Sequence, residues 1–404
     1  MRVLQINTTA NTGSTGRITE EIGQKVIENG YESFIAARKV GPDGSRSNII
    51  KIGSDWDRIL HGLKTRVFDK HGLGSKRATE QLVERISKID PDAIGLHNLH
   101  GYYLNIEVLF KYLSDTQKPV IWTLFDCWAF TGHCSYFDSV GCERWVNGCY
   151  SCPLKNKYPA SYFIDNSKQN YRIKKELFNS IKNLTIVVHS RWLGKLVERS
   201  FLNQYPVKTM PSGVNLEVFK SSTEYLPAEI KKVEKRIVLG VASIWSERKG
   251  LADFKKLAPM LNNHYQIVLV GLTKKQIQDL PDEIIGIPRT ENVQQLASLY
   301  SSAEVFLNPT WSDNFPTTNI EALACGTPVI TYNTGGSPEA VDEDTGFVVE
   351  QGDLKGVVQS LEQISKKGRE SFTEPCRNRA VKHYNKEDRF RDYVELYSKM
   401  LGKS

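Results

Sequence analysis

The sequence lacks the features that mark several large classes of protein. It contains no low-complexity tract and no apolar run of about 18 residues, so neither a disordered chain nor a membrane-spanning chain is predicted. Its formal net charge of +7 is spread thinly, without the basic stripe typical of nucleic-acid-binding proteins. The chain also becomes polar by Asn7 and shows no secretory core, so we expect a cytoplasmic protein.

A disulfide framework is also not predicted, because seven cysteines is an odd number. Four of them, Cys134, Cys142, Cys149 and Cys152, lie in one loop-like stretch that ends in a C-x2-C pair. Four thiolates could bind a structural zinc ion, and free buried thiols or disulfides are the alternatives. In each case the cysteines would hold a loop in place rather than catalyse a reaction.

What the sequence does contain is an alternation of short apolar runs and amphipathic segments, which predicts α/β structure with parallel sheets. The length of 404 residues suits two domains of roughly 200 residues each. A polar run at 221–235 separates the two series, so we predict two Rossmann-like, doubly wound domains at 1–213 and 214–385. The predicted strands are Val3–Ile6, Ser33–Ala36, Ala93–Leu96, Val120–Leu124, Leu184–Val188, Arg236–Val241, Gln266–Val270, Val305–Leu307 and Pro328–Tyr332.

The most informative segment is Asn308–Glu339, which contains a strand end, a loop, a helix and the next strand. Ligands of open α/β sheets bind at the carboxyl ends of the strands, where this loop lies. Thr317 and Thr318 begin a helix whose free N–H groups and dipole suit a diphosphate. Asp313 could accept hydrogen bonds from sugar hydroxyls and Glu321 from a ribose diol. An ordinary loop-to-helix corner with solvated carboxylates is the alternative.

Glu321 follows Asp313 by eight positions. With this spacing the segment resembles the donor-binding motif of the family 4 retaining glycosyltransferases of GT-B fold, in which an acidic residue precedes a Glu. The resemblance covers most of the chain and is closest to transferases of the colanic-acid and capsular-polysaccharide type. It implies that the two domains face a cleft and that a terminal helix, 386–404, crosses back to the first domain. Asp313 stands where the family usually has Glu, which leaves the donor sugar open.

Two weaker motifs agree with this resemblance. Thr12–Arg17 resembles the Gly-rich loop of the first domain, and Ser246–Gly250 resembles the basic phosphate loop of the second. Ile244 stands where the family commonly has Arg, so Lys249 and Arg248 would meet the diphosphate as cations. The resemblance implies a donor site that includes Gly13, Gly16, Arg248, Lys249, Asn314, Phe315, Pro316, Thr317, Thr318 and Glu321.

In the first domain, His97 and Asp126 follow predicted strands and emerge at their carboxyl ends. The resemblance makes His97 a candidate for contact with acceptor or sugar, with a purely structural histidine as the alternative. It also makes Asp126 a candidate for acceptor binding. Together with Asp313 these residues form the predicted catalytic set. The Asp90–Asp92 pair matches an Asp-x-Asp metal pattern but lies at the amino end of a strand, so we do not predict a metal site there.

The resemblance implies a retaining hexosyltransferase that moves a sugar from a UDP- or GDP-sugar to a saccharide or lipid-linked saccharide. Such enzymes serve the synthesis of exopolysaccharide, capsule and other cell-surface glycans. They are thought to work by front-face attack, without a protein nucleophile or a catalytic metal. No cofactor is therefore expected, apart from the structural zinc considered above. The main alternative is a catalytically inactive sugar-nucleotide-binding protein that regulates or scaffolds an assembly; an epimerase or phosphorylase fits the motifs less well.

The stretch Trp56–Lys70 is amphipathic and basic. Trp56, Leu60 and Leu63 recur at helical spacing among basic residues that include Arg58. Such a helix could lie on an anionic membrane that carries a lipid-linked acceptor. A helix packed on the core of its own domain is the alternative.

Overall fold

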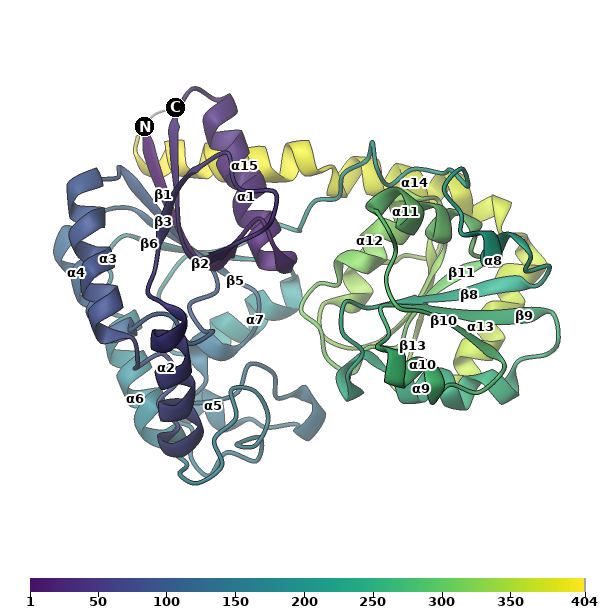
Figure 1. Ribbon diagram of the computed structural model, residues 1–404, viewed down its shortest axis with the longest axis horizontal. Coiled ribbons are helices and arrows are strands. Elements are labelled where there is room, and N and C mark those ends of the chain that lie inside the picture. Colours follow the sequence, from purple (N-terminus) through teal and green to yellow (C-terminus); the bar gives the residue numbers. More distant parts are fainter. Residues whose placement is uncertain (403–404) are drawn as a thin grey trace. The chain divides into compact units, whose positions relative to one another are not determined.

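The computed structural model describes residues 1–402 and divides into two compact units (Figure 1). The first unit contains Met1–Met210 together with the chain from Phe390 onward, and the second contains Pro211–Arg389. The sequence analysis placed the corresponding limits after residues 213 and 385. Each unit is built on one sheet of parallel strands, so the prediction of two Rossmann-like α/β domains is confirmed.

The first unit contains a 7-stranded sheet with the order β3-β2-β1-β4-β5-β6-β7. Its central strands β4 and β5 are buried along their whole length, as expected for a parallel sheet covered on both faces. The strands are β1 Arg2–Ala10, β2 Glu32–Val40, β3 Asn48–Lys51, β4 Ala93–Leu96, β5 Val120–Leu124, β6 Leu184–Val188 and β7 Val207–Thr209. The helices are α1 Gly13–Glu28, α2 Asp55–Phe68, α3 Lys76–Ile89, α4 Ile106–Thr116, α5 Arg144–Asn147, α6 Ser167–Phe178 and α7 Arg191–Arg199, with short 3-10 turns at Trp128–Phe130 and Asp138–Val140.

The second unit contains a 6-stranded sheet with the order β10-β9-β8-β11-β12-β13. Its strands are β8 Arg236–Val241, β9 Tyr265–Val270, β10 Ile284–Ile287, β11 Val305–Asn308, β12 Val329–Tyr332 and β13 Gly346–Val349. Its helices are α8 Ala228–Lys231, α9 Leu251–Leu257, α10 Lys274–Gln278, α11 Val293–Ser302, α12 Thr317–Ala324, α13 Leu354–Lys367 and α14 Glu370–Tyr384, with 3-10 turns η3 Glu247–Lys249, η4 Ala258–Met260 and η5 Ser337–Ala340.

The last helix, α15 (Lys386–Met400), packs on the sheet of the first unit. Phe390, Tyr393 and Tyr397 are buried in a cluster with residues of β1, α1 and β4. The approach is close, because a Cβ atom added at Gly95 would lie 2.2 Å from the Tyr397 hydroxyl oxygen. The apolar stripe of this helix therefore belongs to the core of the first unit, although the helix follows the second unit in the chain.

Four strands of the sheets, β3, β7, β10 and β13, were not among the predicted strands. β3 and β7 lie at the two edges of the first sheet and are largely exposed, so their residues do not form the continuous apolar run that identified β4 or β6. β10 and β13 occupy the edges of the second sheet. Within residues 1–402, no helix combines the length and the apolar character needed to cross a membrane.

Candidate active site

The corner between β11 and α12 provides an open helix N-terminus at the carboxyl end of the second sheet. Strand β11 ends at Asn308, and α12 begins at Thr317 after the N-cap residue Pro316, which makes no side-chain cap. The first N–H groups of a helix have no partner within the helix, and their dipole favours an anion. Thr317 and Thr318 are half-buried in this first turn, where the sequence analysis placed them.

Two residues outside the predicted donor-binding set hold this corner together. Asn319 accepts a hydrogen bond from Asn308 Nδ2 at 2.7 Å and donates to the Ser337 carbonyl at 3.1 Å. It therefore ties α12 to the end of β11 and to the 3-10 turn η5. Gly335 has a positive φ of 57°, and a Cβ atom there would lie 1.9 Å from the Asp313 carbonyl oxygen. Only glycine permits this close approach, which fixes the backbone at Asp313.

Asp313 lies beside two cations from a different loop. Lys249 Nζ is 2.5 Å and Arg248 Nη1 is 3.5 Å from Asp313 Oδ2. Burial alone would raise the pKa of Asp313, but the charges of Lys249 and Arg248 outweigh it and lower this pKa below its ordinary value. The carboxylate is therefore ionised at neutral pH, and the structure brings together the three charged residues that the sequence analysis assigned to the donor site.

The basic loop is held against the loop of Asp313 by backbone contacts. Lys249 ends the 3-10 turn η3 that follows β8, and β8 is the neighbour of β11 in the sheet. The Trp311 N–H donates to the Arg248 carbonyl at 2.8 Å. Gly250 has φ 76°, and a Cβ atom there would lie 2.2 Å from the Pro309 carbonyl oxygen. The spacing of Lys249 and Asp313 is thus set by two adjacent strand ends rather than by flexible side chains alone.

Glu321 lies in the second turn of α12 and is half-buried. Its Oε2 accepts a hydrogen bond from the hydroxyl of Tyr300 at 3.1 Å. Burial, followed by the nearby charge of Glu321, raises the pKa of Tyr300 well above its ordinary value, so the hydroxyl keeps its proton and remains a donor. Tyr300 therefore orients the Glu321 carboxylate.

Three of the predicted donor-site residues are buried in the second unit. Asn314, Phe315 and Pro316 have little exposed surface, and the Phe315 ring lies 5.8 Å from the ring of Tyr384. Phe315 belongs to the main hydrophobic core of this unit. These side chains therefore support the loop from the interior of the unit.

The two predicted glycines of the first unit have different surroundings. Gly13 is exposed at the start of α1 with φ 67°, and its N-cap Thr12 makes no side-chain cap. Gly16 is buried, and a Cβ atom there would lie 2.5 Å from Thr9 Oγ1. Gly16 therefore permits close packing of α1 on β1, and only Gly13 is placed to approach a ligand.

His97 is a buried residue directly after β4. It is only 2% exposed, and its Nε2 lies 2.9 Å from Gln5 Oε1. The amide nitrogen of Gln5 donates to the Thr19 carbonyl, so the amide oxygen is the acceptor and His97 Nε2 carries the proton. Burial lowers the pKa of His97 to about 3, which keeps the ring neutral. A direct contact with a substrate would require this side chain to become exposed.

Asp126 contacts His100 rather than His97. His100 Nε2 lies 2.8 Å from Asp126 Oδ2, and the Trp128 N–H donates to Asp126 Oδ1 at 2.9 Å. The other ring nitrogen of His100, Nδ1, lies 2.8 Å from the hydroxyl of Tyr158. Asp126 thus holds the His100 ring, which in turn meets a half-exposed tyrosine. The sequence analysis favoured His97, and nothing in the sequence pointed to Tyr158.

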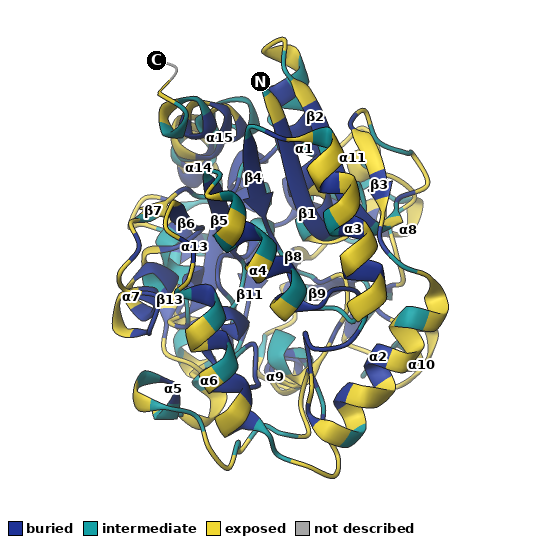
Figure 2. Cartoon of the chain, turned by 90° about the vertical axis from the view of Figure 1, so that its left-hand side faces the viewer, coloured by how far each residue is buried: buried dark blue, intermediate teal, exposed yellow. Residues whose placement is uncertain are grey.

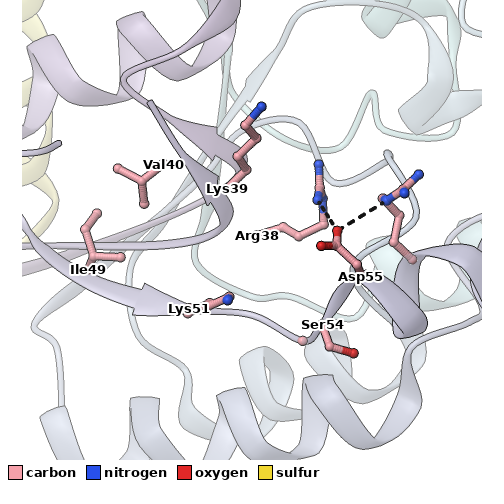
Figure 3. Close-up of a pocket in the computed structure, with 9 residues that line it drawn as sticks. Arg38, Lys39, Val40, Ile49, Lys51, Ser54 and Asp55 are labelled. Carbon is pink, nitrogen blue, oxygen red and sulfur yellow. Dashed lines mark hydrogen bonds and ion pairs between the residues drawn. The ribbon is translucent and has the colours of Figure 1, made fainter. Parts of the chain in front are cut away.

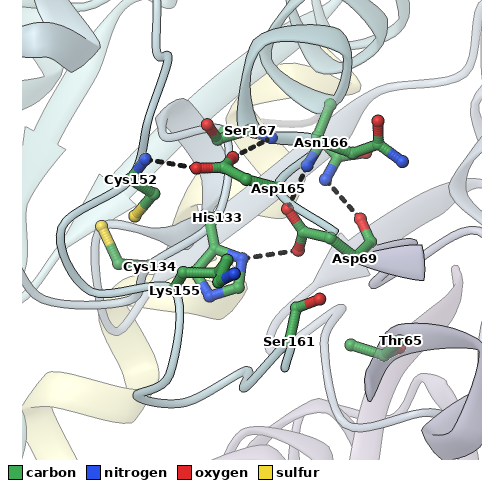
Figure 4. A network of polar contacts seen from close by, with 12 residues as sticks. Thr65, Asp69, His133, Cys134, Cys152, Lys155, Ser161, Asp165, Asn166 and Ser167 are labelled. Carbon is green, nitrogen blue, oxygen red and sulfur yellow. Dashed lines mark hydrogen bonds and ion pairs between the residues drawn. The ribbon is translucent and has the colours of Figure 1, made fainter. Parts of the chain in front are cut away.

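The four clustered cysteines line one small pocket, together with His133. Figure 4 shows how their loop is held: His133 Nδ1 lies 2.5 Å from Asp69 Oδ1, and Asp165 Oδ2 accepts from the Cys152 N–H at 2.6 Å. A hydrogen bond from the Cys134 thiol lowers the pKa of Cys152 to about 7. The alternative of disulfides is not realised, since all four residues are free thiols.

Within residues 1–402, no group of three or more His, Cys, Asp or Glu side chains is arranged to hold a metal ion. The convergence of Cys134, Cys142, Cys149 and Cys152 on one pocket is therefore shown, but a tetrahedral set of ligands is not. A structural zinc ion stays a prediction.

Residues 235–367 match the family model described as glycosyl transferases group 1. They contain the basic loop, Asp313 and Glu321. The second unit is thus similar to group 1 glycosyltransferases over the segment that holds the site. Over 415 aligned residues the chain is 21% identical to the putative colanic acid biosynthesis glycosyl transferase WcaC of Escherichia coli K12, covering 99% of this chain and 100% of that protein.

Solved structures share the fold of this chain over its whole length. Sucrose-phosphate synthase (tll1590) from Thermosynechococcus elongatus aligns with a TM-score of 0.72 and 18% identity, covering 100% of both chains. Anabaena Alr3699/HepE in complex with UDP-glucose aligns with a TM-score of 0.68 and 12% identity, covering 99% of this chain and 100% of that one. The two Rossmann-like domains predicted from the sequence are thus confirmed, and these solved structures share their fold.

Proposed function

We propose that the protein transfers a hexose from a UDP- or GDP-sugar to a saccharide or lipid-linked saccharide acceptor, with retention of anomeric configuration. The observation that carries this proposal is the cluster of Lys249, Arg248 and Asp313 beside the open N-terminus of α12. Two fixed cations and a helix N-terminus are the groups that bind a diphosphate. The similarity to WcaC, together with that to a structure holding UDP-glucose, supports the same substrate class.

The donor would occupy the second unit. Its diphosphate would lie against the first turn of α12 and replace Asp313 as the partner of Lys249. The freed carboxylate of Asp313 would then accept hydrogen bonds from sugar hydroxyls, while Glu321, oriented by Tyr300, would accept from the ribose diol. Asp313 is shorter by one methylene than the Glu that the family usually carries, so its reach to the sugar differs.

The first unit would bind the acceptor. Asp126 and His100 form a hydrogen-bonded pair, and Tyr158 places a hydroxyl at the half-exposed end of that pair. Such neutral and singly charged groups suit the hydroxyls of a saccharide rather than a phosphate. We assign to Asp126 the role of positioning His100 and Tyr158, and to His97 a structural role beneath them.

Catalysis would rest on positioning and on charge stabilisation. The leaving diphosphate can take the proton of the incoming hydroxyl, while Lys249, Arg248 and the α12 N–H groups stabilise the charge that develops on it. These groups supply the positive charge without a catalytic metal. The similarity to WcaC supports a role in the synthesis of an exopolysaccharide, a capsule or another cell-surface glycan.

A thermal-shift panel of UDP-, GDP-, ADP- and CMP-sugars tests the donor site, because a ligand that binds the folded state raises the melting temperature. We expect one nucleotide class to stabilise the wild type and to have little effect on Glu321→Ala. Glu362→Ala, an exposed glutamate of α13 in the same unit, is the matched control and should respond like the wild type.

Two outcomes would contradict the proposal. No response to any donor would remove the donor site from this corner. Donor binding without transfer or hydrolysis on any acceptor would favour the inactive regulatory protein, a reading kept open by Asp313 and by Ile244, which is 75% exposed where the family commonly has Arg. For an active enzyme, the anomeric configuration of the product, read by NMR, decides between retention and inversion.

A further inference from the structure

Helix α2 is inverted, with its apolar side chains outside and its polar side chains inside. Trp56 is 74%, Leu60 62% and Leu63 52% exposed, and Ile59 and Phe68 are exposed as well. The buried residues of α2 are His61, Gly62 and Thr65. Figure 2 shows the helix largely in the colour of exposed residues. Exposing several large apolar side chains on one helix is unfavourable in water unless another surface covers them.

The buried polar face fixes the orientation of this helix. His61 Nε2 accepts from the N–H groups of Gly72 and Gly74 at 3.2 Å each, and its Nδ1 lies 3.0 Å from Ser75 Oγ. Burial lowers the pKa of His61 to about 4, so the ring is neutral and can accept these bonds. Rolling α2 over to bury its apolar stripe would break all three bonds. The stripe therefore stays outside, contrary to the expectation of a helix packed on its own core.

A neighbouring loop extends the apolar surface. The Tyr162 N–H donates to the Arg66 carbonyl at 2.8 Å, which places this loop at the C-terminal end of α2. Tyr162 is 57%, Phe163 74% and Ile164 40% exposed. Two chain segments far apart in the sequence thus present large apolar side chains together, and two of these side chains are the amphipathic aromatics Trp56 and Tyr162.

Positive charge surrounds this surface. The exposed cations here are Arg58, Lys64 and Arg66 on α2 and Lys70 just after it, whereas the first turn of α2 carries the carboxylates of Asp55 and Asp57.

At the N-terminal end of α2 lies a pocket of about 600 Å³ (Figure 3). Its lining contains only one carboxylate, that of Asp55, beside the cations Arg38, Lys39, Lys51 and Arg58. Asp55 Oδ1 is 3.4 Å from Arg38 Nη1 and 3.7 Å from Arg58 Nε, so one carboxylate is shared between two guanidinium groups.

We propose that α2 and the Tyr162–Ile164 loop form a docking surface for an anionic phospholipid bilayer. The apolar side chains would enter the boundary between headgroups and acyl chains, and the cations would meet the anionic headgroups. The pocket beside Arg38 and Arg58 would accept one headgroup phosphate. Neither donor binding nor transfer is needed for this contact, so it can be tested apart from the proposed function.

Co-sedimentation of the full chain with vesicles measures the contact directly. We expect binding to vesicles of equal parts phosphatidylcholine and phosphatidylglycerol, weakened at raised ionic strength, and little binding to phosphatidylcholine alone. Leu60→Gln/Leu63→Gln should lower the partition coefficient by about tenfold or more, because two apolar side chains no longer enter the bilayer. Arg58→Gln/Lys70→Gln should lower it and reduce its dependence on salt.

Matched controls lie on helices of the second unit. Val293→Gln/Val381→Gln replaces two exposed apolar residues of α11 and α14, and Lys366→Gln/Lys382→Gln replaces two exposed cations. Both should bind vesicles like the wild type, and all variants should keep the wild-type melting temperature. Absence of wild-type binding to anionic vesicles would overturn the proposal. So would a dimer in solution that Leu60→Gln/Leu63→Gln converts to monomer, since a second copy would then cover the surface.

Discussion

The two units share one architecture but place different polar groups in it. The second unit gathers charges at the carboxyl end of its sheet, where Lys249, Arg248 and Asp313 meet. The first unit instead contains six of the eight histidines, all buried, and His97, His61 and His189 have lowered pKa values because burial disfavours the charged ring. The second unit thus gathers opposite charges at its site, whereas the histidines of the first unit lie in its interior.

This difference agrees with the proposed binding of the donor by the second unit and of the acceptor by the first. A sugar nucleotide carries its charge on the diphosphate and needs fixed cations. An acceptor presents neutral hydroxyls and needs hydrogen-bonding groups such as His100 and Tyr158. Changes to one unit should therefore affect one substrate, or the stability of one unit, and leave the other in place. The predictions below test this separation, from the largest expected effect to the smallest.

Phe390→Ala should lower the free energy of unfolding of the first unit by about 3–5 kcal/mol, because the ring is 3% exposed in a core shared with β1, α1 and β4. Hydrogen exchange read by mass spectrometry should show faster exchange in β1 and β4 and unchanged exchange in β8 and β11. Leu60→Ala, on the exposed face of α2, should change stability by no more than about 0.5 kcal/mol in the absence of lipid. Equal loss of hydrogen-exchange protection in both units would show that α15 does not stabilise the first unit alone.

Lys249→Ala should lower turnover by about 10²- to 10³-fold, the usual cost of removing one group that stabilises developing charge. It should also weaken donor binding in the thermal-shift assay while leaving acceptor KM unchanged. Lys256→Ala, an exposed lysine of α9, is the control and should behave like the wild type. A Lys249→Ala enzyme with altered acceptor KM and normal donor binding would reverse the assignment of the two units.

Much of the architecture was predictable because buried parallel strands leave a simple pattern. β4, β5 and β6 are fully buried, mostly apolar runs and were identified at their observed limits. Helices α2 and α15 show why the rest was not. Both carry an apolar stripe at helical spacing, but the stripe of α15 is buried while that of α2 is exposed. Periodicity identifies the stripe, whereas the bonds of His61 to the Gly72–Ser75 segment decide which face turns inward.

The candidate site divides in a similar way. The spacing of Asp313 and Glu321 on one loop and helix could be read from the sequence. The contact of Asp313 with Lys249 was not predicted, because it depends on β8 and β11 being neighbours in the sheet. The choice between His97 and His100 could not be made from the sequence. Both lie in one short segment after β4, and the path of the chain there, with Gly101 at φ 117°, turns His100 toward Asp126. Side-chain direction in an irregular loop depends on such contacts rather than on spacing.

Acidification should destabilise the first unit before the second. The folded pKa of His97 is about 3 and that of His189 about 4, below the ordinary value of 6.5 that the unfolded chain retains. As pH falls below 6.5 these histidines bind protons in the unfolded state but not in the folded state. The free energy of unfolding that they contribute above pH 6.5 is therefore lost. Between pH 6.5 and pH 5 each such histidine costs about 2 kcal/mol. His133 opposes this trend, since its bond to Asp69 outweighs burial and raises its pKa.

Hydrogen exchange at pH 7 and pH 5, corrected for intrinsic rates, would measure this effect. Protection should fall in β4, β5 and β6 and change little in β8 and β11. His97→Gln keeps a donor for Gln5 without a titrating ring, so it should reduce the pH dependence of the first unit. If both units lost protection together, or if His97→Gln left the pH dependence unchanged, the buried histidines would not be its source.

Tyr158→Phe has the smallest expected effect that still distinguishes acceptor binding from donor binding. It removes the hydroxyl that meets His100 Nδ1 at 2.8 Å and leaves the ring in place. A single hydrogen bond contributes about 0.5–1.5 kcal/mol, so acceptor KM should rise by up to roughly tenfold. Donor binding should not change, because Tyr158 lies in the first unit. Tyr150→Phe, an exposed tyrosine of the same loop region, should leave both parameters unchanged. A rise in donor KM with Tyr158→Phe would show that the donor also contacts the first unit.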